Sequence, residues 1–158
     1  MPIRNPQSTI RNVSIALLLF ASPLAAQETT IRRAALPPTV ERTVAQQSQG
    51  ATIRGFSKEI EHGQTLYEVE LNVAGRTRDV TIDSAGVVVL VEEEVPLDSL
   101  PPGVLDGIKA QAGESHISLV ERLTKAEKVV AYEAHVTLNG KRREIQVGPN
   151  GEKLDHEE

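Results

Sequence analysis

The sequence contains no cysteine and no tryptophan, and its 158 residues include only two tyrosines and two phenylalanines. Without cysteine the chain forms neither a disulfide framework nor a cysteine-ligated zinc site. It also has no cysteine to which a lipoprotein lipid is attached. We therefore expect a protein whose fold relies on its core alone.

Long hydrophobic runs are absent as well. The apolar run Val13–Ala26 is shorter than the ~20 residues that a membrane-spanning helix needs. It follows Arg4 and Arg11 and ends in small residues, which is typical of a secretory signal peptide over residues 1–26. We expect cleavage near Ala26, a periplasmic or secreted location and no stable membrane insertion after cleavage. The alternative is an uncleaved anchor at the membrane interface.

Basic residues are too few for a nucleic-acid-binding protein. The chain has 17 lysines and arginines against 22 acidic residues, a net charge of −5. Removal of residues 1–26, which hold two arginines and no acidic residue, takes the net charge to −7. Nucleic acids and anionic membrane surfaces both attract basic proteins. The charge balance therefore excludes them as partners.

Motifs that carry catalysis or bind cofactors are missing too. The four histidines, His62, His116, His135 and His156, include no pair four residues apart and no HExxH motif. Ser115 precedes His116, but no G-x-S-x-G turn surrounds it, and no glycine-rich phosphate loop is present. We expect no catalytic, cofactor-binding or metal-binding residues and no cofactor. The protein is predicted not to be an enzyme.

Two stretches of alternating polarity organise the chain, Tyr67–Asp83 and Tyr132–Gly148. A period of two residues predicts half-buried antiparallel strands, with a glycine turn at the centre of each stretch. Asn139-Gly140 is a strong hairpin turn, because both residues tolerate positive φ angles. Ala74-Gly75 is weaker, since alanine resists that conformation.

Two-residue turns at these positions fix the expected register of both hairpins. The predicted cross-strand pairs are Tyr67–Ile82, Val69–Val80, Glu70–Asp79, Leu71–Arg78, His135–Glu144, Val136–Arg143 and Thr137–Arg142. The Glu70–Asp79 pair places two carboxylates opposite each other, which costs on the order of 0.2–1 kcal/mol. Either it attracts a basic partner, or Arg76, Arg78 or a slipped register relieves it.

The two hairpins belong to a longer repetition. Leu36-Pro37-Pro38 returns about 64 residues later as Leu100-Pro101-Pro102, and the tyrosines and glycines of the hairpins recur in step. We predict an α+β fold in which two tandem helix-plus-antiparallel-strand repeats form one antiparallel sheet with helices on one face. The expected parts are a flexible lead-in over residues 27–35, a first repeat over 36–98 and a second over 99–158.

Other segments follow from local composition. The prolines predict a helix from Leu36 to about Ser48, and Thr52–Glu61 is predicted to be a strand. The aliphatic run Val87–Val91 is typical of a central strand covered on both faces. Glu92–Asp98 is predicted to be an acidic, solvated connector rather than a calcium site.

Short motifs in the hairpins resemble those of the PepSY family and its PepSY-like relatives, whose fold is similar to that of the proteinaceous β-lactamase inhibitor. The residues that carry the resemblance are Tyr67-Glu68-Val69, Gly75-Arg76, Val80-Thr81-Ile82-Asp83 and Gly86, with Tyr132-Glu133-Ala134, Gly140-Lys141, Ile145-Gln146-Val147 and Gly151 in the second copy. The second copy departs from the pattern at Gly148 and Pro149. Over residues 36–153 the resemblance implies an exported, non-catalytic module that inhibits or regulates peptidases or binds envelope ligands.

The polar side of the predicted sheet is the candidate binding surface. Residues that share this side are Glu68, Glu70, Asp79, Glu133, His135, Arg142 and Glu144. An extended segment can bind such a surface or a free strand edge. We expect a binding module for a protein or peptide of the cell envelope, possible roles being inhibitor or regulator of a peptidase or another envelope protein. The alternative is a structural or stress-related envelope protein without a dedicated ligand site.

Overall fold

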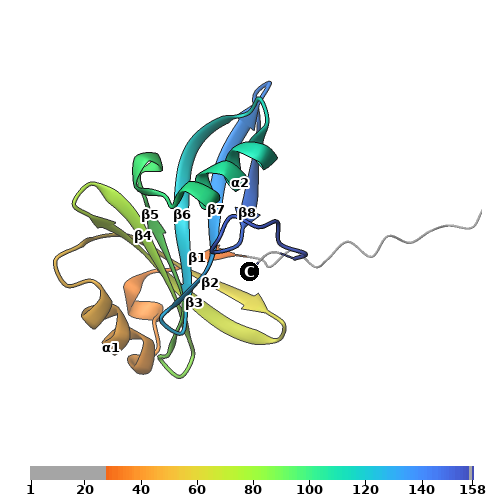
Figure 1. Ribbon diagram of the computed structural model, residues 1–158. Helices are drawn as coiled ribbons and strands as arrows, with labels where there is room; N and C mark the ends of the chain where they lie inside the picture. Colours follow the sequence, from red (N-terminus) through yellow and green to blue (C-terminus); the bar gives the residue numbers. More distant parts are fainter. Residues whose placement is uncertain (1–27, 157) are drawn as a thin grey trace, which may run out of the picture.

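The computed structural model describes residues 28–156 and 158, and the expected signal peptide, residues 1–26, lies outside them. One antiparallel sheet dominates the molecule, and each strand pairs with its neighbours in the sequence (Figure 1). The strands are β1 (Thr29–Thr30), β2 (Thr52–Glu61), β3 (Gln64–Val73), β4 (Arg76–Asp83), β5 (Val88–Glu94), β6 (His116–Lys125), β7 (Lys128–Leu138) and β8 (Lys141–Val147).

The predicted fold class, α+β with two tandem helix-plus-strand repeats, is wrong. Eight strands form a single consecutive sheet, while α-helix is confined to α1 (Pro38–Gln47) and α2 (Pro102–Ala112). Each helix begins at a proline and is only 10 or 11 residues long. The repeated proline motifs mark where these helices start. They do not indicate that the helices are short and that most of the ordered residues lie in strands. The architecture is therefore mainly β.

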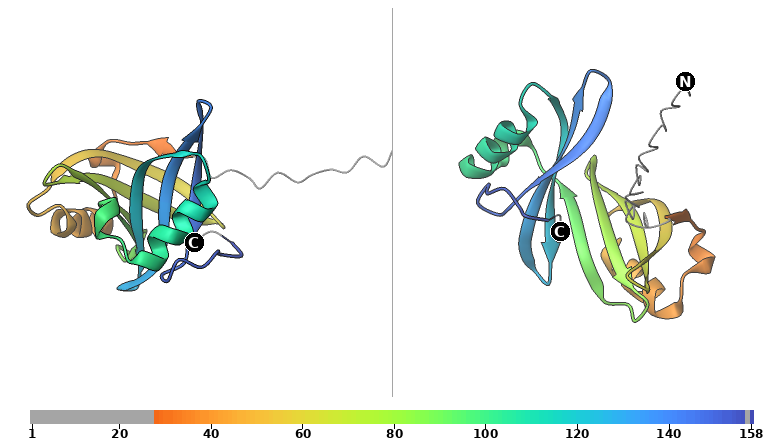
Figure 2. Two further views of the ribbon diagram at one scale, coloured as in Figure 1. Left: turned by 45° about the horizontal axis from the view of Figure 1, so that its top comes forward. Right: turned by 90° about the vertical axis from the view of Figure 1, so that its right-hand side faces the viewer.

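Two short helices cover separate parts of the sheet (Figure 2). Val40 and Val44 of α1 are fully buried, as are Val104 and Ile108 of α2. Around each helix lies its own apolar cluster. The first comprises Val40, Val44, Phe56, Val69, Leu71, Val80 and Ile82; the second comprises Leu100, Val104, Ile108, Ala112, Val120, Tyr132, Ala134, Val136, Ile145 and Val147.

The predicted hairpin registers are confirmed. In the β3–β4 pair, Val69 lies opposite Val80 and Glu70 lies opposite Asp79. In the β7–β8 pair, His135 lies opposite Glu144. Because directly paired residues point to the same side of a sheet, these registers separate the helix-covered side from a polar side.

The tight turns at Ala74-Gly75 and Asn139-Gly140 offer a matched test of turn chemistry. Ala74 and Asn139 both have a φ angle of +52°, which asparagine tolerates better than alanine. We expect Ala74→Asn to raise the free energy of unfolding by about 1 kcal/mol and Asn139→Ala to lower it by a similar amount. Urea unfolding of both variants measures this. Shifts of the same sign would contradict the explanation.

The acidic run Glu92-Glu93-Glu94 is not a connector, contrary to the prediction. All three residues lie in β5, where they pair with Leu123, Arg122 and Glu121 of β6. Backbone pairing with β6 keeps this segment extended, so its charges fall alternately on the two sides of the sheet. Every residue of β5 is only partly buried, so the expected strand covered on both faces is also wrong.

The segment before α1, expected to be a flexible lead-in, contains two short elements. Residues of β1 pair with Lys58 and Ser57 of β2, and a 3₁₀ helix spans Arg33–Ala35. The Arg33 guanidinium donates hydrogen bonds to the Glu41 carboxylate at 2.7–3.2 Å. A second 3₁₀ helix, Leu97–Ser99, precedes α2.

Candidate functional site

The side of the sheet opposite the helices carries a continuous set of ionisable residues. Strand pairing links them: Glu70 lies opposite Asp79, Asp79 opposite Glu92, Glu94 opposite Glu121, and Glu121 opposite Glu133. We call this surface the polar face. It comprises Glu68, Glu70, Asp79, Glu92, Glu94, Glu121, Glu133, His135, Arg142 and Glu144.

All seven residues predicted from the sequence lie on the polar face, but the structure does not gather them into one cluster. Glu68, Glu70 and Asp79 lie on β3 and β4, whereas the remaining four lie on β7 and β8. The residues between the two groups, Glu92, Glu94 and Glu121, were not predicted. They turn two separate patches into one acidic surface.

Several of these carboxyl groups hold their protons more tightly than usual. Burial is the main cause in every case, and repulsion from neighbouring carboxylates adds to it. The pKa of Glu68 is raised to about 7, helped by Asp79. The pKa of Asp79 is raised to about 6. For Glu92, burial followed by repulsion from Glu121 and Glu133 raises the pKa to about 8.

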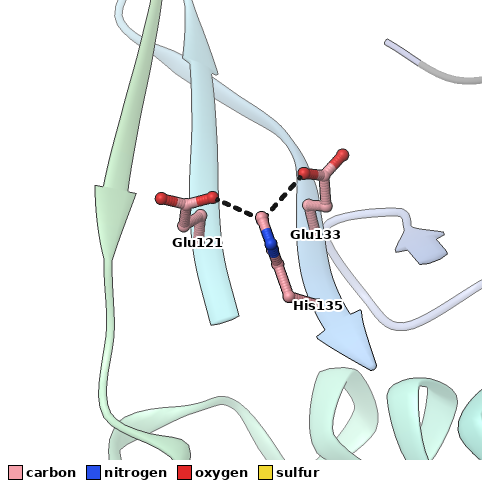
Figure 3. Close-up of side chains that lie close together, drawn as sticks. All are labelled: Glu121, Glu133 and His135. Carbon is pink, nitrogen blue, oxygen red and sulfur yellow. Dashed lines mark hydrogen bonds and ion pairs between the residues drawn. The ribbon is translucent and has the colours of Figure 1, made fainter. Parts of the chain in front are cut away.

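The most enclosed group of the polar face consists of Glu121, Glu133 and His135 (Figure 3). Glu121 and Glu133 are only 7% and 9% exposed. His135 Nε2 lies 3.1 Å from Glu121 Oε2 and 3.4 Å from Glu133 Oε1. Burial is the leading cause that raises the Glu133 pKa, and a hydrogen bond from Gln146 opposes it. The imidazole thus lies between two buried carboxylates.

Neighbouring strands hold the other carboxylate oxygens of this group. Gln146 Nε2 donates to Glu133 Oε2 at 2.7 Å, and Thr77 Oγ1 donates to Glu121 Oε1 at 3.4 Å. The backbone N–H of Thr77 donates to Glu94 Oε2 at 3.0 Å. These contacts fix the carboxylates in place from β8 on one side and β4 on the other.

Glu121 was missed because it lies in β6, a strand that was not predicted from the sequence, and the register of β6 and β7 is irregular as well. A uniform two-residue turn at Ala126-Glu127 would place Glu121 opposite Tyr132, but the pairing shifts between Leu123 and Thr124. A bulge of one residue moves every following side chain into a new register. Ala126 and Glu127 both have positive φ angles, which alanine and glutamate rarely adopt. The turn between β6 and β7 was therefore also hard to predict.

The other predicted residues are more exposed. The Glu70 carboxylate lies over Gly55, where a Cβ atom would approach Glu70 Oε1 to 2.8 Å. Glu144 Oε1 lies 3.8 Å from His135 Nδ1. Arg142 and Glu144 are exposed on β8.

Within residues 28–156 and 158, none of the helices combines the length and hydrophobicity needed to cross a membrane.

Comparison with known proteins finds similar folds. No protein-family model matches the chain, and no curated protein is significantly similar to it. A DUF2874 family protein from Bacteroides ovatus has 18% identity and a TM-score of 0.59, over 76% of this chain and 85% of that one. A protein from Bacteroides eggerthii described as periplasmic has 17% identity and a TM-score of 0.62, over 75% and 86%.

A BLIP-like protein from Bacteroides fragilis has 19% identity and a TM-score of 0.55, over 75% of this chain and 83% of that one. At such identities a similarity establishes the fold alone. The chain therefore has a BLIP-like fold. The periplasmic or secreted location expected from the sequence agrees with the description of the Bacteroides eggerthii protein.

Proposed function

We propose that the protein is an exported, non-catalytic binding module whose polar face binds a basic segment of a protein or peptide in the cell envelope. The observation that carries the proposal is the set of partly buried carboxyl groups with raised pKa values, Glu68, Asp79 and Glu92. Burial and repulsion from neighbouring carboxylates make the charged form of each group unfavourable. A cationic side chain placed among them would stabilise the charged forms.

Charge complementarity gives such an interface its specificity. A lysine or arginine above Glu70 and Asp79 meets two carboxylates at once, because these residues lie directly opposite each other. Acidic residues elsewhere on the face favour a basic partner over an acidic one and speed its approach. Since binding a cation favours the ionised carboxyls, association would release protons near neutral pH.

The resemblance to PepSY-like modules and the BLIP-like fold support an inhibitory or regulatory role. In this proposal the partner is a peptidase or another envelope enzyme, and the polar face blocks or reshapes its substrate-binding surface. The absence of cysteine and of a serine-nucleophile turn from the sequence supports the non-catalytic part of the proposal.

Charge reversal on the polar face tests the proposed surface. We expect the double variant Glu70→Lys, Asp79→Lys to lose the partners that the wild-type protein captures from an envelope extract. Purified partner should bind it at least about tenfold more weakly, because attraction to the partner's basic side chain becomes repulsion. Isothermal titration calorimetry with the captured partner measures the change.

The matched control is the double variant Asp106→Lys, Glu114→Lys, which makes the same charge change at exposed positions on and after α2. It should bind as the wild type does. Unchanged capture by the polar-face variant would contradict the proposal. An assay of the captured enzyme with and without this protein then decides whether binding inhibits it. If nothing is captured and deletion alters envelope integrity, the structural role replaces the binding role.

A further inference from the structure

We propose that Glu121, Glu133 and His135 form a binding site for one divalent transition-metal ion such as Zn²⁺. One atom from each of the three side chains lies within 4.8 Å of the other two. Two adjacent strands, β6 and β7, supply all three residues, so the paired backbone fixes their spacing. This proposal is independent of the identity of any protein partner.

In each of the two carboxylates, one oxygen contacts a neighbouring strand and the other faces His135, as ligands of a shared metal ion would. Glu121 Oε1 lies 3.4 Å from Thr77 Oγ1, whose single hydrogen it shares with Glu94 Oε2, and Glu133 Oε2 accepts a hydrogen bond from Gln146. The remaining oxygens, Glu121 Oε2 and Glu133 Oε1, both point toward His135 Nε2. Each carboxylate is thus anchored through one oxygen and offers the other to a shared centre.

Hydrogen bonds within the protein do not fully satisfy His135 Nε2, Glu121 Oε2 and Glu133 Oε1. The Nε2 atom carries at most one hydrogen, so it cannot serve both carboxylate oxygens well. Glu121 and Glu133 are also direct cross-strand neighbours, and like charges in that arrangement repel. Among the described residues, the ion pairs that these two glutamates form are with His135. A bound cation would satisfy all three donor atoms and remove the repulsion.

The distances fit a small divalent ion. Zinc–ligand bonds of about 2.1 Å at tetrahedral angles place neighbouring ligand atoms about 3.4 Å apart. The separations from His135 Nε2 to the two oxygens, 3.1 and 3.4 Å, are close to that value. An imidazole nitrogen with two carboxylate oxygens suits zinc and its first-row neighbours, whereas calcium prefers a shell made of oxygen atoms.

Outer contacts orient the ligands further. His135 Nδ1 lies 3.8 Å from Glu144 Oε1, which is an ion-pair distance but too long for a hydrogen bond. The Gln146 side chain that holds Glu133 is itself held, because its Oε1 accepts a hydrogen bond from the Glu158 backbone N–H at 2.9 Å. The His135 side chain is 36% exposed. The imidazole is therefore accessible to solvent from the polar face.

Titration of the purified, metal-free full chain with ZnCl₂ tests the site. We expect one equivalent to bind to the wild type at pH 7.5. His135→Ala and the double variant Glu121→Gln, Glu133→Gln should bind about tenfold or more weakly. His62→Ala and His116→Ala are the controls, because both histidines are exposed and lie outside the cluster. They should bind as the wild type does.

Two further measurements separate loss of ligands from loss of structure. The double glutamine variant removes two repelling charges, so in the presence of EDTA it should melt at or above the wild-type temperature. Added zinc should raise the melting temperature of the wild type but not of this variant. The absorption spectrum of the Co²⁺-loaded wild type should show a site of mixed nitrogen and oxygen ligands.

The proposal is overturned if zinc binding is absent from the wild type. It is equally overturned if binding survives His135→Ala and the double glutamine change, or if it is lost in the His62 and His116 controls instead. Each of these results would leave His135 as a hydrogen-bonding partner of the two glutamates and nothing more.

Discussion

Gly107→Ala is expected to lower the free energy of unfolding by about 2–4 kcal/mol. In a free helix the same change would be stabilising by roughly 0.5–1 kcal/mol, because glycine is the weaker helix former. The expected sign is therefore opposite to the one that helix propensity alone predicts. The cause lies in how α2 packs on the turn that follows β8.

Two glycines of α2 allow its backbone to touch that turn. A Cβ atom on Gly107 would collide with the carbonyl oxygen of Gly151, and one on Gly103 would come within 2.6 Å of the Asn150 carbonyl oxygen. Both obstacles are backbone atoms, which cannot rotate away. Helix α1 also lies close to the turn after β4, where a Cβ atom on Gly86 would come within 2.8 Å of the Thr39 carbonyl oxygen. There Thr39 and Thr43 also donate hydrogen bonds to the carbonyl oxygens of Ser84 and Gly86.

Chemical denaturation followed by circular dichroism measures the effect. Ala110→Gly, at an exposed position of the same helix, is the control and should cost only about 1 kcal/mol. A Gly107→Ala variant as stable as the wild type would show that α2 does not pack this closely on the turn.

Stability is also expected to fall as the pH rises from 5 to 8, by about 2–4 kcal/mol after allowance for solvent screening of these partly exposed groups. The carboxyls responsible are Glu68, Asp79 and Glu92, with pKa values of about 7, 6 and 8 in the folded protein. Glu92 is faced by Glu121, Glu133, Glu68 and Asp79, all of them acidic.

The direction follows from proton linkage. Between the ordinary carboxyl pKa near 4.5 and the raised value, the folded state keeps a proton that the unfolded state has released. The retained proton stabilises the folded state fully below the unfolded-state pKa. This stabilisation is lost as the pH rises to the folded-state pKa, and above that pKa the free energy of unfolding no longer changes with pH. Many proteins show the opposite trend, because their carboxylates gain partners on folding and stability falls with acid.

Glu92→Gln provides the matching variant. We expect it to be about 1–3 kcal/mol more stable than the wild type at pH 8 and nearly equal to it at pH 5, because glutamine cannot ionise. Urea unfolding in the presence of EDTA measures both values without contribution from metal ions. Glu114→Gln, at an exposed position, is the control and should leave the free energy of unfolding unchanged at both pH values. A gain of equal size at both pH values would contradict the linkage.

The parts of the fold that follow local rules were predictable. Asn139-Gly140 and Gly75 fixed two hairpin turns, and the turns fixed the registers that place Glu70 opposite Asp79. Prolines marked where α1 and α2 begin. Each of these features depends on the backbone preferences of one or two residues, and such preferences are visible in a single sequence.

The centre of the polar face was not predictable in the same way. Glu92 and Glu94 were read as solvated because consecutive charges usually avoid a sheet, yet pairing with β6 overrides that preference. Glu121 reaches Glu133 only through the irregular β6–β7 register. The fold class was wrong for a different reason: the proline motifs mark where two helices begin, but they do not show that eight strands joined in one sheet outweigh those helices.

The pairing of β5 with β6 has a consequence for how the molecule bends. β5 and β6 share four residue pairs, from Val91–Thr124 to Glu94–Glu121, and the two apolar clusters lie on either side of them. On the helix-covered side the junction is ionic, since Glu93 pairs with Arg78 and Arg122. We expect this junction to bend more easily than either apolar cluster, because few hydrophobic contacts cross it. Dissolved salt weakens its ion pairs, so the stiffness of the junction should fall as the ionic strength rises.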